Sequence, residues 1–123
     1  MKIVIKIGDL SVNAALNDTV TAKKIAEILP FISSFSTWGE EIYFSIPVTS
    51  GLDESAREKV ELGDLGYWPT GKAFCIFFGP TPMSGPGEIV PASAVNIVGK
   101  VTDDPKQFLE VMGMNEITIE LQD

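Results

Sequence analysis

The chain has 123 residues and a mass of 13.3 kDa, which suits one domain with one hydrophobic core. Hydrophobic residues make up 45% of it and charged residues 21%, a composition that excludes a disordered or fibrous protein. The net charge of −8 would repel phosphate backbones and anionic lipid headgroups, so we expect neither nucleic acid nor a membrane as a partner.

The N-terminal residues predict a β-hairpin. Apolar and polar residues alternate over residues 3–7, which places the isoleucines on one face of a strand. The alternation resumes over residues 10–16, and Gly8-Asp9 between the two runs is a typical hairpin connection. A signal peptide has a continuous apolar core instead, and no apolar run is long enough to span a membrane, so we expect a cytoplasmic protein.

A helix is predicted after the hairpin. Apolar residues recur at helical spacing from Ala22 to Leu29, and Thr19 is among the candidate N-terminal caps. Pro30 is expected to end the helix, because proline disfavours helical geometry in the residue before it. We expect residues 31–39 to form a loop that carries aromatic residues among serines.

The next segment predicts a strand and then a region with two interpretations. Residues 42–46 alternate as a strand, which Pro47 stops. Residues 49–58 are either a short helix, supported by a pairing of Asp53 with Arg57 one turn apart, or a solvated loop. We favour a loop here.

The central part of the chain contains its most apolar segment. Residues 60–68 predict one or two short strands broken by glycines, and residues 69–71 predict a turn. Residues 73–78 are apolar on both faces of a strand, so this strand should be covered on both sides or line a cavity. Residues 79–87 hold three prolines and three glycines and predict an irregular loop.

The C-terminal part predicts two strands with a helix between them. The strands are residues 95–101 and 117–121, and the helix begins with Asp104 as cap and Pro105 as first residue. The total is about eight strands and two helices without the βα alternation of a parallel sheet. We therefore predict a mainly β fold, a closed antiparallel β-barrel whose open ends are plugged by the helices, in one domain over residues 1–123.

The absence of histidine and the single cysteine exclude several classes of enzyme. Without histidine the chain lacks the commonest metal ligand and the usual general base, and its single cysteine, Cys75, forms no disulfide or CxxC motif. Prolines remove backbone donors from the loop at 79–87, so phosphate binding is disfavoured. Adjacent carboxylates such as Glu40 and Glu41 point different ways and give no acid/base geometry. We expect no cofactor and no metal.

Three segments resemble small prokaryotic cyclophilin-like proteins of unknown function. They are residues 63–82, GDLGYWPTGKAFCIFFGPTP, residues 38–44, WGEEIYF, and the predicted helix at 21–30. Together with the order of elements, the resemblance covers nearly the whole chain. It implies a cyclophilin-like barrel, and it introduces peptidyl-prolyl cis-trans isomerisation as an activity of related proteins.

The chain departs from the pattern of the true cyclophilins at their active site. Those enzymes carry an arginine in a Phe-His-Arg context and a Gly-Ser-Gln-Phe-Phe run. The only arginine here, Arg57, lies in the acidic segment, and residues 71–76 occupy the place of that run, with Cys75 where a pocket phenylalanine stands. Arg57 is the one candidate catalytic residue, and a solvated side chain is the favoured interpretation.

Aromatic residues near proline- and glycine-rich loops are the candidates for a ligand cleft, since rings make good walls for proline or ring-bearing ligands. Trp68, next to a proline at a strand end, is the best single candidate. The predicted ligand-binding residues are Trp38, Tyr43, Tyr67, Trp68, Phe78 and Met83.

Two functions are consistent with these observations. The first is a binding domain whose aromatic cleft holds a small apolar molecule or a proline-containing peptide. The alternative is a weak or altered peptidyl-prolyl isomerase, and fold alone does not decide between them. A homo-oligomeric subunit is a third interpretation, because several aromatic residues lie near loops.

Overall fold

A computed structural model of the chain describes residues 1–122, and in this part ten strands form one antiparallel sheet. The strands are β1 (Lys2–Ile7), β2 (Leu10–Leu16), β3 (Phe31–Ser34), β4 (Ser36–Thr37), β5 (Glu41–Ser45), β6 (Ala56–Arg57), β7 (Asp64–Trp68), β8 (Ala73–Phe77), β9 (Val95–Val101) and β10 (Glu116–Leu121). The helical segments are the α-helix α1 (Val20–Glu27) and the 3₁₀ helices η1 (Pro69–Gly71) and η2 (Pro105–Val111).

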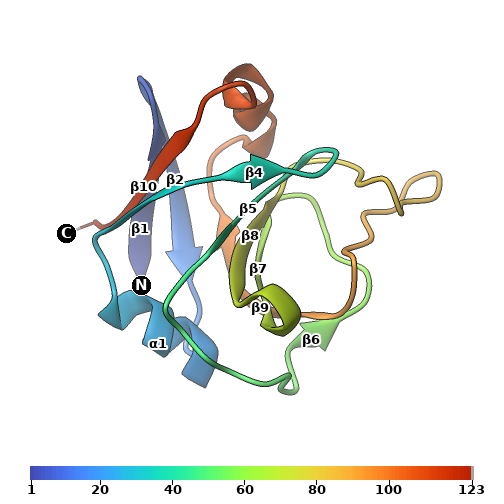
Figure 1. Cartoon of the computed structure of the whole chain (residues 1–123), viewed down its shortest axis with the longest axis horizontal. Coiled ribbons are helices and arrows are strands. Elements are labelled where there is room, and N and C mark those ends of the chain that lie inside the picture. Colours follow the sequence, from blue (N-terminus) through green and yellow to red (C-terminus); the bar gives the residue numbers. More distant parts are fainter. Residues whose placement is uncertain (123) are drawn as a thin grey trace.

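The strands follow one another around a barrel that is nearly closed (Figure 1). Their order is β3-β10-β1-β2-β9-β7-β8-β5-β4, and β6 pairs with β9 outside this path. The strands at the two ends of the path, β3 and β4, are separated in sequence by Phe35 alone, so the chain itself bridges the seam. The predicted mainly β, antiparallel barrel is confirmed, with ten strands in the described residues where about eight were predicted.

Helical segments lie at opposite ends of the barrel, α1 at the bottom of Figure 1 and η2, in orange-red, at the top. Ile25 of α1 and Phe108 of η2 are fully buried in the barrel core. Of the candidate caps of the first helix, Thr19 is the N-cap, and Asp104 caps the second helix as predicted: the side chain of each accepts a backbone N–H group of the first helical turn. The second helix is 3₁₀ rather than α. In the described residues no helix is long and apolar enough to cross a membrane.

The prediction of a loop at residues 31–39 is wrong, because β3 and β4 lie there. β3 pairs with β10, where Phe31 lies opposite Ile119, and β4 pairs with β5, where Ser36 lies opposite Tyr43. The apolar residues of this serine-rich segment do not alternate with a period of two, so local sequence gives no strand signal. The partner strands decide its conformation.

Residues 49–58 form a loop that ends in the short strand β6, as the favoured interpretation has it, and no helix is present in them. Asp53 does not pair with Arg57 in the described structure: its carboxylate accepts the backbone N–H of Ser55 at 2.7 Å. The Asp53 N–H donates to the side chain of Asn96 at 2.9 Å, which ties the loop to β9.

Strand β8 separates two hydrophobic cores, which confirms that this strand is covered on both faces. Phe74, Ile76 and Phe78 point into the barrel core, where Phe44 stacks on Phe74 with ring centres 5.5 Å apart. The alternate residues Ala73, Cys75 and Phe77 point outward and form a smaller outer core together with Val60 and Val95. The outer core requires a second layer of chain outside the barrel.

Residues 79–94 contribute to that second layer and are tied to neighbouring segments at several points. They form the yellow and orange loop at the right of Figure 1. The N–H of Glu40 donates to Pro80 at 3.0 Å, and the N–H of Val60 donates to the carbonyl of Ile89 at 2.9 Å. Inside the loop the hydroxyl of Thr81 donates to the carbonyl of Val90. The irregular loop therefore has a fixed course against the sheet.

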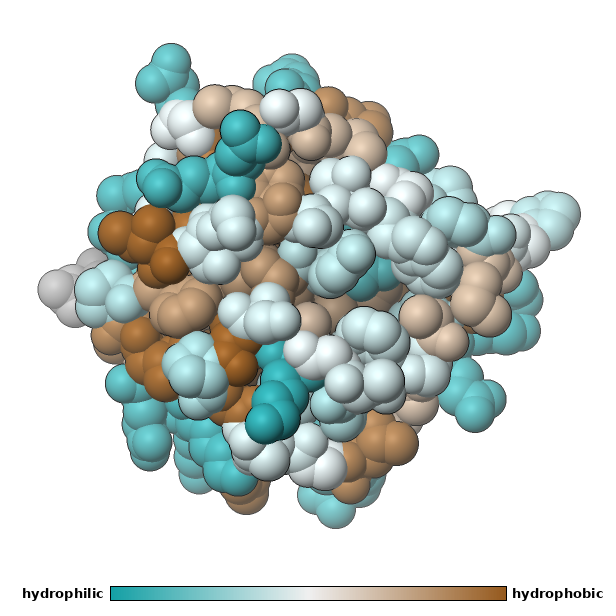
Figure 2. Space-filling model, in the orientation of Figure 1, coloured by the Kyte–Doolittle hydropathy of each residue, from teal (hydrophilic) through white to brown (hydrophobic). Residues whose placement is uncertain are grey.

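The other half of the barrel leaves its outer face more open to solvent. Figure 2 shows hydrophobic side chains gathered at the left, on the side where β3 and β10 lie. Ile32 of β3 and Leu121 of β10 are 63% and 45% exposed. The outer core of the described residues lies instead on the half formed by β7, β8 and β9, and this asymmetry decides where a cleft can form.

Replacing Gly99 with alanine is expected to destabilise the barrel. Gly99 lies opposite Leu16 where β9 meets β2, and a Cβ atom there would collide with the carbonyl oxygen of Ala15. Because that oxygen belongs to the backbone, we expect Gly99→Ala to lower the free energy of unfolding by about 1–3 kcal/mol in urea denaturation. Gly51→Ala is the control, since no atom lies within 4 Å of its Cβ position. Equal free energies for the two variants would contradict the prediction.

Candidate functional site

A cavity of about 240 Å³ lies at the margin of the outer core, and we call it the aromatic cleft. Three ring-bearing side chains line it together with one carboxyl and one small residue. The lining residues are Trp38, Glu41, Tyr43, Trp68 and Ala92. They come from the β4–β5 turn, from β5, from the end of β7 and from the loop before β9, so residues distant in sequence meet there.

The register of β5 aims two of these side chains at the cleft. Tyr43 lies opposite Cys75 of β8, and Glu41 lies opposite Phe77. Cys75 and Phe77 belong to the outer core, so Glu41 and Tyr43 stand on the outer face of the sheet. The alternate residues of β5 point into the barrel core. The cleft is therefore built on the same face as the outer core, beside β8.

Trp68 is held in place from two sides. Its indole Nε1–H donates to the hydroxyl of Ser93 at 2.6 Å. Its ring packs so closely on Gly71 that a Cβ atom there would lie 2.7 Å from the ring atom Cζ3. The turn of η1 therefore requires glycine at position 71 for the indole to keep this place.

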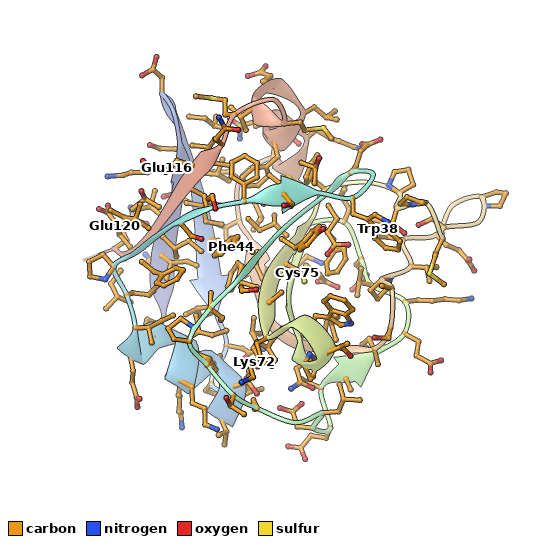
Figure 3. The ribbon with its side chains drawn as sticks, in the orientation of Figure 1. Trp38, Phe44, Lys72, Cys75, Glu116 and Glu120 are labelled. Carbon is orange, nitrogen blue, oxygen red and sulfur yellow. The ribbon has the colours of Figure 1, made fainter. Side chains whose placement is uncertain are left out.

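Trp38 lies at the turn between β4 and β5, as its label in Figure 3 shows. Its backbone N–H donates to the carbonyl of Glu41 at 2.9 Å and closes the turn. Gly39 follows with φ of 60°, and a Cβ atom on it would lie 2.8 Å from the carbonyl oxygen of Pro80. The turn that presents Trp38 is thus packed on the loop of the second layer.

Glu41 is the unusual group of the cleft. It is only 6% exposed, and its Oε1 has no hydrogen-bond partner among residues 1–122. Burial raises the pKa of its carboxyl from 4.5 to about 7, and the neighbouring Cys75 thiol lowers it by a smaller amount. Burial likewise raises the pKa of Cys75 well above its ordinary value, and the charge of Glu41 adds to this effect. The cleft therefore holds a carboxyl that changes charge near neutral pH.

The adjacent glutamate has a different environment. Glu40 forms an ion pair with Lys106, with 3.3 Å between Oε1 and Nζ. Glu40 lies in the bend before β5 with its carboxyl beside Gly79 and Lys106, whereas the Glu41 side chain lines the cleft, so the two carboxyls have different surroundings although they are adjacent in sequence. Glu40 is therefore a natural control for experiments on Glu41.

Three of the predicted ligand-binding residues meet in the cleft, and three do not. Trp38, Tyr43 and Trp68 line it. Tyr67 and Phe78 lie in the barrel core instead, both fully buried, because strand alternation turns them inward. The Tyr67 hydroxyl donates to the carbonyl of Val48 at 2.6 Å, and the Phe78 ring lies 5.7 Å from that of Phe108. Met83 is 55% exposed on the loop and does not line the cleft.

Glu41 and Ala92 were not among the predicted site residues. The sequence does contain a signal for Glu41, because strand alternation places it on the same face as Tyr43. The apolar strand at residues 73–78, which pairs with this one, also predicts that a second layer covers that face. Ala92 belongs to a loop whose course depends on distant contacts, and no pattern in the sequence marks it.

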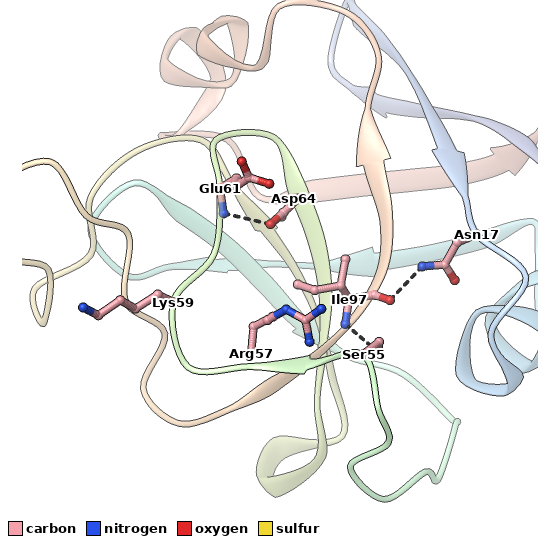
Figure 4. A pocket seen from close by; sticks show the side chains of 7 residues that line it. All are labelled: Asn17, Ser55, Arg57, Lys59, Glu61, Asp64 and Ile97. Carbon is pink, nitrogen blue, oxygen red and sulfur yellow. Dashed lines mark hydrogen bonds between the residues drawn. The ribbon is translucent and has the colours of Figure 1, made fainter.

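The candidate catalytic residue Arg57 lies in a different cavity, of about 510 Å³, shown in Figure 4. Its guanidinium donates to the carbonyls of Ala56 at 2.8 Å and Glu54 at 3.3 Å. This cavity is lined by Asn17, Ser55, Arg57, Lys59, Glu61, Asp64 and Ile97. It shares no lining residue with the aromatic cleft, so the structure does not bring Arg57 together with the aromatic residues.

Comparison with known proteins identifies the family. A family model described as cyclophilin-like matches residues 1–120, so the chain belongs to the cyclophilin-like family, and the predicted resemblance is confirmed. The solution structure of the hypothetical protein AF2241 from Archaeoglobus fulgidus is 34% identical, with a TM-score of 0.79, over 99% of this chain and 95% of that one.

A second solved structure shares the fold alone. The structure of McbB in complex with tryptophan has a TM-score of 0.72 at 16% identity. The match covers 98% of this chain but 44% of McbB. No curated protein matches the chain.

Glu41 is expected to make the protein less stable as the pH rises from about 4.5 to 7. Its pKa is higher in the folded chain, at about 7, than the ordinary 4.5 of an exposed glutamate, so in this range the folded state binds a proton that the unfolded state has lost. We expect Glu41 to account for a fall of about 3 kcal/mol in the free energy of unfolding. Urea denaturation at several pH values measures it, and Glu41→Gln should remove this part of the fall.

Glu40→Gln serves as the control, since it removes a carboxyl from the next position and leaves Glu41 intact. Glu40→Gln should therefore show the full fall in the free energy of unfolding between about pH 4.5 and 7. Parallel pH profiles for the parent protein and Glu41→Gln would show that the Glu41 carboxyl titrates normally.

Proposed function

We propose that this member of the cyclophilin-like family is a binding domain whose aromatic cleft holds a small, largely apolar ligand or a proline-bearing segment of a peptide. One observation carries the proposal: the rings of Trp38, Tyr43 and Trp68 come from separate segments and line one cavity outside the barrel core. Tyr43 and Trp68 also pack against the outer core but stay partly exposed at the cleft, whereas Tyr67 and Phe78 are fully buried in the barrel core.

The size of the cleft supports a small ligand. Its volume is about 240 Å³, whereas a cavity of about 150 Å³ is known to take up benzene. A single aromatic ring or a prolyl ring with its adjoining atoms therefore fits. Most of the contacts would be apolar, with Glu41 as the polar group that fixes orientation.

The cleft is also formed before any ligand arrives. Ser93 and Gly71 hold the indole of Trp68, and the turn carrying Trp38 is packed on Pro80. Side chains that are already ordered lose little conformational entropy on binding, which favours affinity for a small molecule.

Isomerisation of prolyl bonds has less support as an alternative. It needs a pocket for the ring and a hydrogen-bond donor close to the prolyl nitrogen. The cleft offers the pocket, but the only arginine, Arg57, lines the other cavity. We therefore place binding ahead of catalysis. We further propose that the partner is a small molecule or a peptide, since the net charge of −8 disfavours nucleic acid. The proposed location is the cytoplasm.

Ligand binding is expected to depend on Trp68. A panel of soluble single-ring compounds and N-acetylprolinamide, screened by saturation-transfer NMR, should give binders that the Trp68→Ala variant binds at least about tenfold more weakly, since a central aromatic wall is lost. Both tryptophans of the chain line the cleft, so their fluorescence reports its occupancy directly. Met83→Ala, on the exposed loop, should bind as the parent protein does. A panel without a single binder at the cleft would refute the proposal.

The protein is expected to leave the rate of prolyl isomerisation unchanged in a coupled assay with a proline-containing peptide, even at high protein concentration. Arg57→Ala and Trp68→Ala should be as inactive as the parent. Acceleration that Trp68→Ala abolishes would restore the isomerase interpretation and place its active site in the cleft, whereas acceleration that only Arg57→Ala abolishes would place it in the other cavity.

A further inference from the structure

We infer that the ligand of the aromatic cleft carries an organic ammonium group, which lies against the rings and pairs with the carboxylate of Glu41. The inference rests on the proposed function and adds the chemical class of the ligand to it.

The carboxyl of Glu41 has the Cys75 thiol as a neutral neighbour, but it has no cationic partner in the described part of the chain. It is 6% exposed and lines the cleft, and its Oε1 is without a hydrogen-bond partner in the described part of the chain. Buried polar groups are nearly always satisfied, so an unsatisfied one calls for an explanation. No lysine or arginine is among the residues that line the cleft in residues 1–122. A cation bound from outside would fill this place.

The rings around the carboxyl suit the same cation. The faces of tryptophan and tyrosine rings are electron-rich and attract a cation placed within about 6 Å of the ring centre. Trp38, Tyr43 and Trp68 provide three such rings in one cavity with the acid. A ligand that only needed apolar walls would gain nothing from a buried carboxylate, which costs free energy to keep charged without a partner.

An organic ammonium fits better than a metal ion. Hard metal ions require several oxygen ligands, and the cleft offers one carboxyl beside three rings and an alanine. Within residues 1–122 no group of three acidic or sulfur side chains is placed to hold a metal. An ammonium group that carries methyl or methylene groups can present its apolar surface to the rings and its charge to the carboxylate.

Among the groups in and around the cleft, the Glu41 carboxyl is the one whose charge changes near neutral pH. Tyr43 of β5 and Cys75 of β8 are the titratable neighbours, while Trp38, Trp68 and Ala92 carry no charge. The thiol of Cys75 stays protonated near neutral pH because burial raises its pKa well above the ordinary value. The pKa of Glu41 is about 7 in the free protein. A cation should therefore bind more weakly as the pH falls below about 7, approaching tenfold for each unit.

The decisive experiment compares choline with 3,3-dimethylbutan-1-ol, its uncharged counterpart of the same shape. Binding is followed by tryptophan fluorescence and by shifts of the two indole N–H signals in NMR. At pH 8 choline should bind at least about tenfold more tightly than the alcohol, and only choline should lose affinity at pH 5.5. Glu41→Gln should reduce choline to the affinity of the alcohol, whereas Glu40→Gln should change neither compound.

The outcomes separate this inference from the proposed function. If the alcohol binds as tightly as choline and Trp68→Ala weakens both, the cleft binds ligands but not by charge, and the inference is overturned. If neither compound binds while single-ring compounds do, the inference is likewise overturned and the proposed function stands. If the single-ring compounds also fail to bind, both the inference and the proposed function are overturned. A fold defect in Glu41→Gln is excluded by its free energy of unfolding at pH 8, which should equal or exceed that of the parent.

Discussion

The burial of strand β8 on both faces is the constraint on which the rest of the structure depends. Phe74, Ile76 and Phe78 are buried in the barrel, and Cys75 and Phe77 are buried outside it. A barrel normally leaves its outer face to solvent, so these outward residues would expose apolar surface without a second layer. Residues 79–94 help to form that layer, and their hydrogen bonds with Glu40 and Val60 hold it in place.

The cleft lies where this second layer ends. Gly66 lets the outer core close tightly, since a Cβ atom on it would lie 3.0 Å from a methyl group of Val95 and 3.1 Å from the ring of Phe77. At the cleft the second layer contributes the small residue Ala92 to the lining, and a cavity of about 240 Å³ remains. The same cover that buries Phe77 also buries Glu41 opposite it, so the acid is a consequence of the layer that forms the cleft.

Sequence predicts those parts that rest on local signals. The hairpin of β1 and β2 follows from alternation, and the cap at Asp104 follows from residue type. The strand at Phe31 depends on β10, more than eighty residues away, and could not be seen locally. In the cleft, residue type identifies Trp38 and Trp68 as candidates, and strand alternation places Glu41 on the same face as Tyr43. That this face lies against the outer core follows from the register of β5 against β8, which is a property of the folded sheet.

The environment of Glu41 differs from that of the ion-paired acids of this chain. Three other glutamates have ion-pair partners: Glu40 pairs with Lys106, Glu88 with Lys59 and Glu120 with Lys6. Glu41 is more deeply buried than any of these three and has no such pair in the described residues. A glutamine has the same shape and no charge, so it would avoid the cost of burying a carboxylate that raises the pKa of Glu41. Natural proteins keep such local conflicts mainly at functional sites, where a bound group resolves them. The ammonium ligand proposed for the cleft would account for a carboxyl that weakens the free protein and stands among three rings.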